Sequence, residues 1–279
     1  MIDWVMRRLR GLRAPRPRNP GPTRLPRTIW MLWLQGWDET PEVVDACMRT
    51  WRRCNPDWEL RLLAEGDLPA LIGDDAGMRT IAGKHLPSEA LSDVVRLALL
   101  LRYGGVWADA TTYCLRPLDD WLPPMLALGF FAFTNFSPDR MIASWFLAAE
   151  PGNRLLEIWQ AYVVDYWRRR ARRHMHFWFH GFLYSRAYRE NREFRAIWKA
   201  TPTLSSRGPA QLASRLGKPL PQAQWDAITR SGVPMLKLRH RQADSPFGRQ
   251  SAYRKLVDLA LRDDESPDEG RAGAVSPLA

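Results

Sequence analysis

The chain has 279 residues, of which 46% are hydrophobic, and its formal net charge is +11. This hydrophobic fraction can build a large buried core, while the lack of any run of 18 apolar residues predicts no transmembrane helix. Three cysteines without a CxxC pair favour reduced thiols over a disulfide scaffold. The positive charge predicts an anionic partner: nucleotide phosphates, an anionic membrane surface or nucleic acid.

Residues 1–25 form a basic, Pro-rich segment that we expect to precede the folded domain as a linker. Apolar residues near its start share one helix face between arginines, which is typical of a weak membrane-surface anchor; the alternative is a solvated tail. No apolar core of a secretory signal follows this start. We therefore expect a cytoplasmic protein, with the anchor giving peripheral association with the inner membrane face. The acidic residues 263–279 are predicted to form a disordered tail.

The first half of the domain alternates strand and helix patterns. Residues 28–35 and 58–64 are predicted as strands, and residues 41–54 between them as a helix. This order and spacing are typical of a βαβ unit, and hence of a parallel sheet. A mostly apolar helix follows within residues 86–105 and ends at its two final glycines, because a left-handed turn is easiest for glycine. Residues 106–108 are predicted as a short strand.

The second half becomes mainly helical. Its predicted elements are strands at 129–134 and 141–149, a helical region from Asn153 to about Tyr188, and shorter helices within 208–230 and 249–262. We therefore expect an α/β half followed by a helical half. Both halves would share one core in a single domain spanning residues 26–262.

A single carboxylate, Asp109, follows the predicted strand after the glycine pair. Open α/β sheets bind ligands just beyond the ends of their strands. An aspartate there can ligate Mg²⁺ or Mn²⁺ bridging two phosphates, because hard cations prefer oxygen ligands. Gly104 and Gly105 would let a diphosphate approach the backbone, and Thr111 could offer a hydroxyl from the same side of an extended segment. The alternative is that Asp109 only caps a turn.

Asp93 and Arg96 lie three residues apart on the apolar helix and therefore share one face. Two interpretations remain open from this spacing. The pair faces a nucleotide, or it forms a solvated ion pair on the helix surface.

Aromatic and histidine residues give weaker signals. Trp30, Trp33 and Trp37 lie on or near the first strand and could stack on a base or sugar, or pack in the core. His176 and His180 share a helix face that two metal ligands could use, but no acid lies nearby in the run. For His180 the favoured interpretations are acceptor binding and plain packing. The basic run 168–173 could contact the phosphates of a lipid-linked acceptor, or could be a solvated helix end.

The sequence resembles the capsular polysaccharide synthesis family of glycosyltransferases, related to DXD-type sugar transferases such as the initiating α-mannosyltransferases of yeast. The resemblance rests above all on LSDVVRLALLLRYGGVWADATTYCLRPLDDWL (91–122). Supporting segments are PRTIWMLWLQGW (26–37), TWRRCNPDWELRLL (50–63), SWFLAAEPGN (144–153) and LKLRH (236–240).

The resemblance implies a GT-A-like, Rossmann-type nucleotide-diphospho-sugar transferase fold. It also implies transfer of a sugar from a nucleoside diphosphate sugar to a glycan or lipid-linked acceptor in surface polysaccharide synthesis. Asp93 matches an aspartate near the nucleotide, and Asp109 matches the first aspartate of the DXD motif, which holds a divalent cation (Mn²⁺ or Mg²⁺). The motif departs at Thr111, where the wider group has a second aspartate. Arg96 with Lys237 or His240 would then stabilise charge on the departing diphosphate.

Two rival functions remain. A transferase-like protein that binds sugar nucleotides without catalysis would fit the missing second aspartate. A basic nucleic-acid-binding protein would fit the net charge, but the sequence has no zinc finger, RNP-like segment or clear helix-turn-helix. We therefore expect no nucleic-acid partner.

Overall fold

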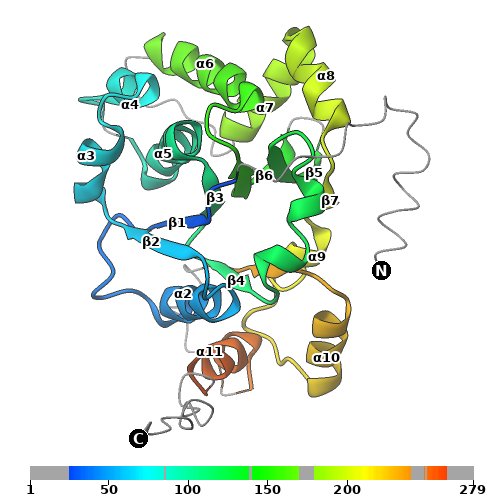
Figure 1. Ribbon diagram of the computed structural model, residues 1–279. Helices are drawn as coiled ribbons and strands as arrows, with labels where there is room; N and C mark the ends of the chain where they lie inside the picture. Colours follow the sequence, from blue (N-terminus) through cyan, green and yellow to red (C-terminus); the bar gives the residue numbers. More distant parts are fainter. Residues whose placement is uncertain are drawn as a thin grey trace, which may run out of the picture.

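The computed structural model describes residues 25–84, 86–137, 140–169, 179–239, 248 and 250–262 (Figure 1). A six-stranded sheet in the order β2-β1-β3-β6-β5-β7 forms the centre, and helices lie on both of its faces. Its strands are β1 (Thr28–Leu32), β2 (Glu59–Leu63), β3 (Gly105–Ala108), β5 (Phe130–Ser137), β6 (Arg140–Ala149) and β7 (Leu204–Ser205). The acidic tail and all of the basic segment except Leu25 lie outside the described residues.

One half of the sheet is parallel. β1 pairs in parallel with both β2 and β3. Helix α2 (Glu42–Cys54) connects β1 to β2, and helix α5 (Ser88–Tyr103) leads directly into β3. The predicted α/β class and its βαβ unit are therefore confirmed, although β1 ends three residues before the predicted limit.

The rest of the sheet is mixed, so the parallel arrangement predicted from the βαβ unit covers only part of it; at the far edge β5 pairs in parallel with β7. β6 pairs antiparallel with both β3 and β5. The reason is the connection between β5, which ends at Ser137, and β6, which begins at Arg140. Parallel neighbours need a crossover of about a dozen residues, and this connection is far too short for one.

The C-terminal half is mainly helical, as predicted. Its helices are α6 (Arg154–Arg168), α7 (Phe179–Glu190), α8 (Arg192–Ala200), α9 (Arg207–Ala210), α10 (Gln222–Arg230) and α11 (Ala252–Arg262). Shorter helical elements before it are η1 (Glu65–Asp67), α3 (Leu68–Ile72), α4 (Ala76–Ile81), η2 (Leu118–Asp120) and η3 (Pro123–Met125). Two strands that the sequence patterns did not indicate, β4 (Thr112–Cys114) and β8 (Met235–Lys237), pair antiparallel in a separate small sheet. None of the described helices has the length and apolar character needed to cross a bilayer.

Both faces of the main sheet are buried. Alternate residues of β1 divide between two apolar clusters: Ile29 and Met31 pack with α2 and α11, whereas Trp30 and Leu32 pack with α5 and α6. This period of two is the geometry of a strand with a helical layer on each side. Figure 1 shows the two layers, with α5, α6 and α7 on one side of the sheet and α2 and α11 on the other.

The glycine pair between α5 and β3 serves close packing. Gly104 and Gly105 have φ angles of 66° and 94°. A Cβ on Gly105 would lie 2.5 Å from the carbonyl oxygen of Thr28, and one on Gly104 would lie 2.6 Å from Pro151 Cδ. The pair stands at the start of β3, whereas Asp109 follows its end. The structure therefore replaces the predicted role of admitting a diphosphate with a role in joining α5 to the sheet.

Candidate active site

Asp109 follows the carboxyl end of β3 and begins a tight turn. Its backbone N–H donates to the carbonyl of Trp145 at 2.9 Å, and its carbonyl accepts bonds from the N–H and the hydroxyl of Thr112 at 2.9 and 2.6 Å. Trp51 Nε1 donates to the Thr112 carbonyl at 2.8 Å. The predicted turn is therefore present, and it fixes the backbone from which the carboxylate projects.

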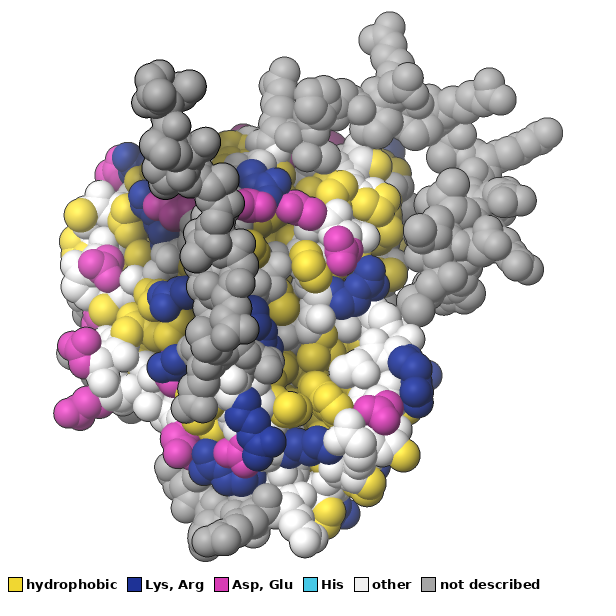
Figure 2. Space-filling view, turned by 60° about the horizontal axis from the view of Figure 1, so that its bottom comes forward, with side chains coloured by type: hydrophobic (Ala, Val, Ile, Leu, Met, Phe, Trp, Pro, Cys, Tyr) yellow, Lys and Arg dark blue, Asp and Glu magenta, His cyan; other side chains and the backbone are white. Residues whose placement is uncertain are grey.

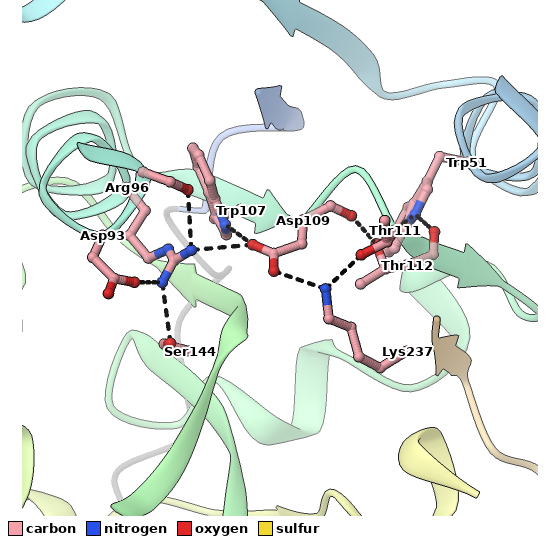
Figure 3. Close-up of polar contacts among 10 residues, drawn as sticks. Trp51, Asp93, Arg96, Trp107, Asp109, Thr111, Thr112, Ser144 and Lys237 are labelled. Atoms are coloured by element: carbon pink, nitrogen blue, oxygen red, sulfur yellow. Dashed lines mark hydrogen bonds and ion pairs between the residues drawn. The ribbon is translucent and has the colours of Figure 1, made fainter. Parts of the chain in front are cut away.

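The Asp109 carboxylate lies between two cationic side chains (Figure 3). Oδ1 accepts from Arg96 Nη2 at 3.1 Å and from Trp107 Nε1 at 2.9 Å. Oδ2 accepts from Lys237 Nζ at 2.8 Å, and the same ammonium donates to Thr111 Oγ1 at 2.6 Å. Four residues that the sequence singled out (Arg96, Asp109, Thr111 and Lys237) therefore meet in one place.

Arg96 joins this carboxylate to Asp93. The guanidinium donates to Asp93 Oδ1, to Ser144 Oγ at 3.0 Å and to Ser92 Oγ at 3.2 Å. It also stacks over the Trp107 ring at 5.2 Å from the centroid. The Arg96 side chain is only 5% exposed, so the solvated ion pair considered from the sequence does not form. Instead the pair is buried, and Arg96 connects Asp93 to the Asp109 carboxylate.

His180 packs behind Asp93 in the interior. Its Nδ1 lies 3.3 Å from Asp93 Oδ1, and its ring stacks on Trp159 with centroids 4.1 Å apart. Burial, and secondarily the charge of Arg96, lowers the pKa of His180 well below its ordinary value. The side chain is 2% exposed, so packing is confirmed and a direct contact with an acceptor is not.

The two aspartates are driven to opposite protonation behaviour. Burial raises the pKa of Asp93 to about 7, against the opposing influence of Arg96. Burial acts on Asp109 in the same sense, but Lys237 and then Arg96 outweigh it and leave the pKa of Asp109 below its ordinary value. At neutral pH, Asp109 is therefore ionised while Asp93 is close to its midpoint.

The predicted tryptophans divide between core and edge. Trp30 is buried and donates to the Gly104 carbonyl at 2.9 Å, which confirms the packing interpretation. Trp33 is half-buried one residue beyond β1. The β1–β3 register pairs Trp30 with Trp107, so Trp33 stands at the same edge of the sheet as Asp109. Trp37 is also half-buried and donates to the Leu63 carbonyl at 3.0 Å.

Three neighbours of the site were missed, and one predicted residue lies elsewhere. Trp107 could have been found from the period of a strand, because its side chain points to the same side as that of Asp109 two residues later. No local pattern indicates Ser92 or Ser144, whose contacts depend on the guanidinium between them. His240 lies outside the described residues.

The described residues do not fit the Mn²⁺ or Mg²⁺ ion expected on Asp109. Both carboxylate oxygens already accept hydrogen bonds, and two of the three donors are cations. Within the described ranges, no group of three His, Cys, Asp or Glu side chains could hold a metal ion. The second position of the motif offers only the Thr111 hydroxyl, which is turned to Lys237.

An α/β sheet with a charged cluster at the carboxyl edge of its parallel strands is typical of a protein that binds its ligand at this edge. The family described as "Capsular polysaccharide synthesis protein" matches residues 14–256, and the chain belongs to this family. The resemblance noted from the sequence is therefore confirmed.

Curated relatives are similar over part of the chain. The O-glycosyltransferase braB of Annulohypoxylon truncatum is 25% identical over 52% of this chain and 39% of its own length. The glycosyltransferase afumC of Aspergillus fumigatus is 34% identical over 33% of this chain and 26% of its own length. The initiation-specific alpha-1,6-mannosyltransferase of Saccharomyces cerevisiae is 29% identical over 35% of this chain and 22% of its own length. The matches thus span well under half the length of these relatives.

One solved structure, the PaToxG glycosyltransferase, is similar with a TM-score of 0.46 and 14% identity. That match covers 84% of this chain and 87% of the other.

Proposed function

We propose that this protein is a glycosyltransferase that moves a sugar from a nucleoside diphosphate sugar to a glycan or lipid-linked acceptor. The observation that carries the proposal is the cluster of Arg96, Asp109 and Lys237 at the carboxyl edge of a GT-A-like sheet. Membership of the capsular polysaccharide synthesis family and the glycosyltransferase names of the relatives support it.

The chemistry of the cluster suits a diphosphate leaving group. Cleavage of the sugar–phosphate bond leaves negative charge on the phosphates, and fixed cations stabilise that charge best in a site that excludes water. Lys237 and Asp109 are 21% and 25% exposed in their side chains, so both can be reached by a ligand, whereas Arg96 lies behind them. Asp109 holds both cations in place through its two oxygens.

The acceptor side of the proposal rests on surface character. Figure 2 shows the face toward which α10 and α11 are turned, where Lys and Arg side chains stand beside exposed apolar ones. Leu261 and Arg262 at the end of α11 are both exposed. Such a surface suits an anionic lipid-linked acceptor in surface polysaccharide synthesis, with the basic segment 1–25 giving peripheral association with the inner membrane face.

A second candidate is a protein that binds sugar nucleotides without transferring sugar. The specific observation in its favour is Thr111, which stands where a second carboxylate would complete a metal site. Binding alone does not separate the two candidates, because both retain a donor site. Release of nucleoside diphosphate from the donor does separate the two candidates.

The test combines binding with turnover. UDP-, GDP- and dTDP-sugars, with a CMP-sugar as the monophosphate comparison, are assayed by thermal shift and by release of the free nucleotide. We expect stabilisation by one diphosphate class and slow release of its nucleotide, both abolished in Asp109→Asn. The exposed Asp38 provides a matched control, Asp38→Asn, with unchanged turnover. Binding without release would favour the second candidate, and turnover by Asp109→Asn would remove Asp109 from the mechanism.

A further inference from the structure

The ammonium of Lys237 occupies the place at Asp109 where a divalent cation would bind. Its Nζ lies 2.8 Å from Asp109 Oδ2 and 2.6 Å from Thr111 Oγ1. A Mg²⁺ or Mn²⁺ ion would need about 2.0–2.2 Å to the same carboxylate oxygen. At that distance it would also lie within a few ångströms of two positive side chains, Lys237 and Arg96.

The charges of the site favour the ammonium over the metal. Asp109 carries one negative charge and already contacts two cations, so an added divalent ion would find no uncompensated carboxylate there. Thr111 supplies a neutral hydroxyl rather than a second negative oxygen. One carboxylate and one hydroxyl already accept from the Lys237 ammonium, and a divalent ion would have to displace it to reach either oxygen.

Lys237 is also built to contact a ligand. Pairing of β4 with β8 sets Lys237 opposite Thr112 and fixes its backbone. An ammonium has three donors, and the contacts with described residues use two of them. The side chain is 21% exposed, so its third donor can reach a ligand from the open side of the site.

We propose that Lys237 is the cation of the diphosphate subsite and that donor binding and transfer proceed without a divalent metal. This inference rests on the proposed function and names what balances the charge of its leaving group. Arg96 holds Asp109 from behind, Asp109 and Thr111 aim the ammonium, and Lys237 donates to a phosphate oxygen of the donor.

The test measures donor turnover, and binding of UDP and GDP by calorimetry, in EDTA and in Mn²⁺. Wild-type protein should bind and turn over with similar constants in both conditions. Lys237→Met should lose about 10- to 100-fold in affinity in EDTA, the range expected for one charge-assisted hydrogen bond. Lys237→Arg should retain most of the affinity, and Lys199→Met at an exposed site on α8 is the matched control.

A gain of metal binding gives a second readout that does not depend on activity. In Lys237→Met/Thr111→Asp, two carboxylates would face one another without the ammonium. This double variant should bind Mn²⁺, measured by loss of the free-ion electron paramagnetic resonance signal, whereas the wild-type protein should not.

The outcomes separate the two proposals. Wild-type turnover that requires Mn²⁺, or Lys237→Met that matches wild type in EDTA, would overturn the role of Lys237 and leave the transferase intact. If Lys237→Met does not fold, the wild-type comparison and Lys237→Arg still decide. Failure of every sugar nucleotide to bind in both conditions would overturn the proposed function itself.

Discussion

Asp93 should make the stability of the folded protein depend on pH across the neutral range. Its pKa rises from an ordinary 3.8 to about 7, chiefly through burial. Between these values the folded chain binds a proton that the unfolded chain has released, so the free energy of unfolding falls as pH rises. The stability that Asp93 contributes is fully present at a pH below its pKa in the unfolded chain. It is lost as pH rises through its pKa in the folded chain.

The size of the effect follows from the same two values. Each pH unit inside the window is worth about 1.4 kcal/mol, which gives a loss of about 2.5 kcal/mol between pH 5 and pH 8. Other groups face Asp93. The lowered pKa of Asp109 keeps it ionised over this range, and Arg96 and the half-buried Glu89 lie on the same helix as Asp93. His180 acts in the opposite direction below about pH 6.5, because burial keeps it neutral in the folded state.

Comparison with Asp93→Asn isolates the contribution of this carboxyl group. Urea denaturation of both proteins at pH 5, 6, 7 and 8 and constant ionic strength gives the difference in unfolding free energy at each pH. We expect wild type to lose about 2.5 kcal/mol relative to the variant from pH 5 to pH 8. A difference that stays constant over these values would refute the raised pKa and the argument from burial.

Backbone packing, the guanidinium of Arg96 and the basic segment each give a further prediction. Gly105→Ala should lower the free energy of unfolding by about 1–3 kcal/mol more than Gly36→Ala. Both glycines have positive φ, but only at Gly105 would the new Cβ meet a backbone oxygen, so equal losses in urea denaturation would contradict this. Arg96→Lys should lower the free energy of unfolding by about 2 kcal/mol and weaken sugar-nucleotide binding, because an ammonium cannot replace the guanidinium fork. Arg230→Lys, at an exposed position, is the control. Removing residues 1–24 should weaken sedimentation with anionic vesicles at least about 10-fold with an unchanged melting temperature, and unchanged sedimentation would exclude the anchor.

The sequence predicted the parallel half of the sheet because its signals are local. The apolar run of β1, the helical spacing of α2 and the glycine stop after α5 each lie within a few residues. The antiparallel pairing of β5 with β6 depended on a connection of two residues, which the separate strand patterns did not reveal. The same limit explains why β8 was not predicted, because it is three residues long and pairs with a strand more than a hundred residues earlier.

The candidate site was predicted in part for the same reason. Asp93, Arg96 and Asp109 fall within one short segment, so a helix face and a strand end bring them together. Lys237 was reached through the family resemblance, since 128 residues separate it from its carboxylate. The packing role of the glycines could not be predicted from their closeness to Asp109 in the sequence. Gly105 begins β3 and Asp109 follows its end, so the two residues lie about 13 Å apart at the rise of a strand.

The charges of the site alternate along one chain of contacts: Asp93, Arg96, Asp109 and Lys237. With Asp93 ionised this chain is neutral, and with Asp93 protonated it carries one net positive charge. A diphosphate brings negative charge toward the chain, and a like charge disfavours the ionised form of a carboxyl group. On the proposed function, Asp93 therefore acts as a positioning residue whose proton supplies part of the charge balance that a metal ion would otherwise provide. This explains why a carboxylate is kept in the interior, where burial makes it costly, directly behind the arginine that it orients.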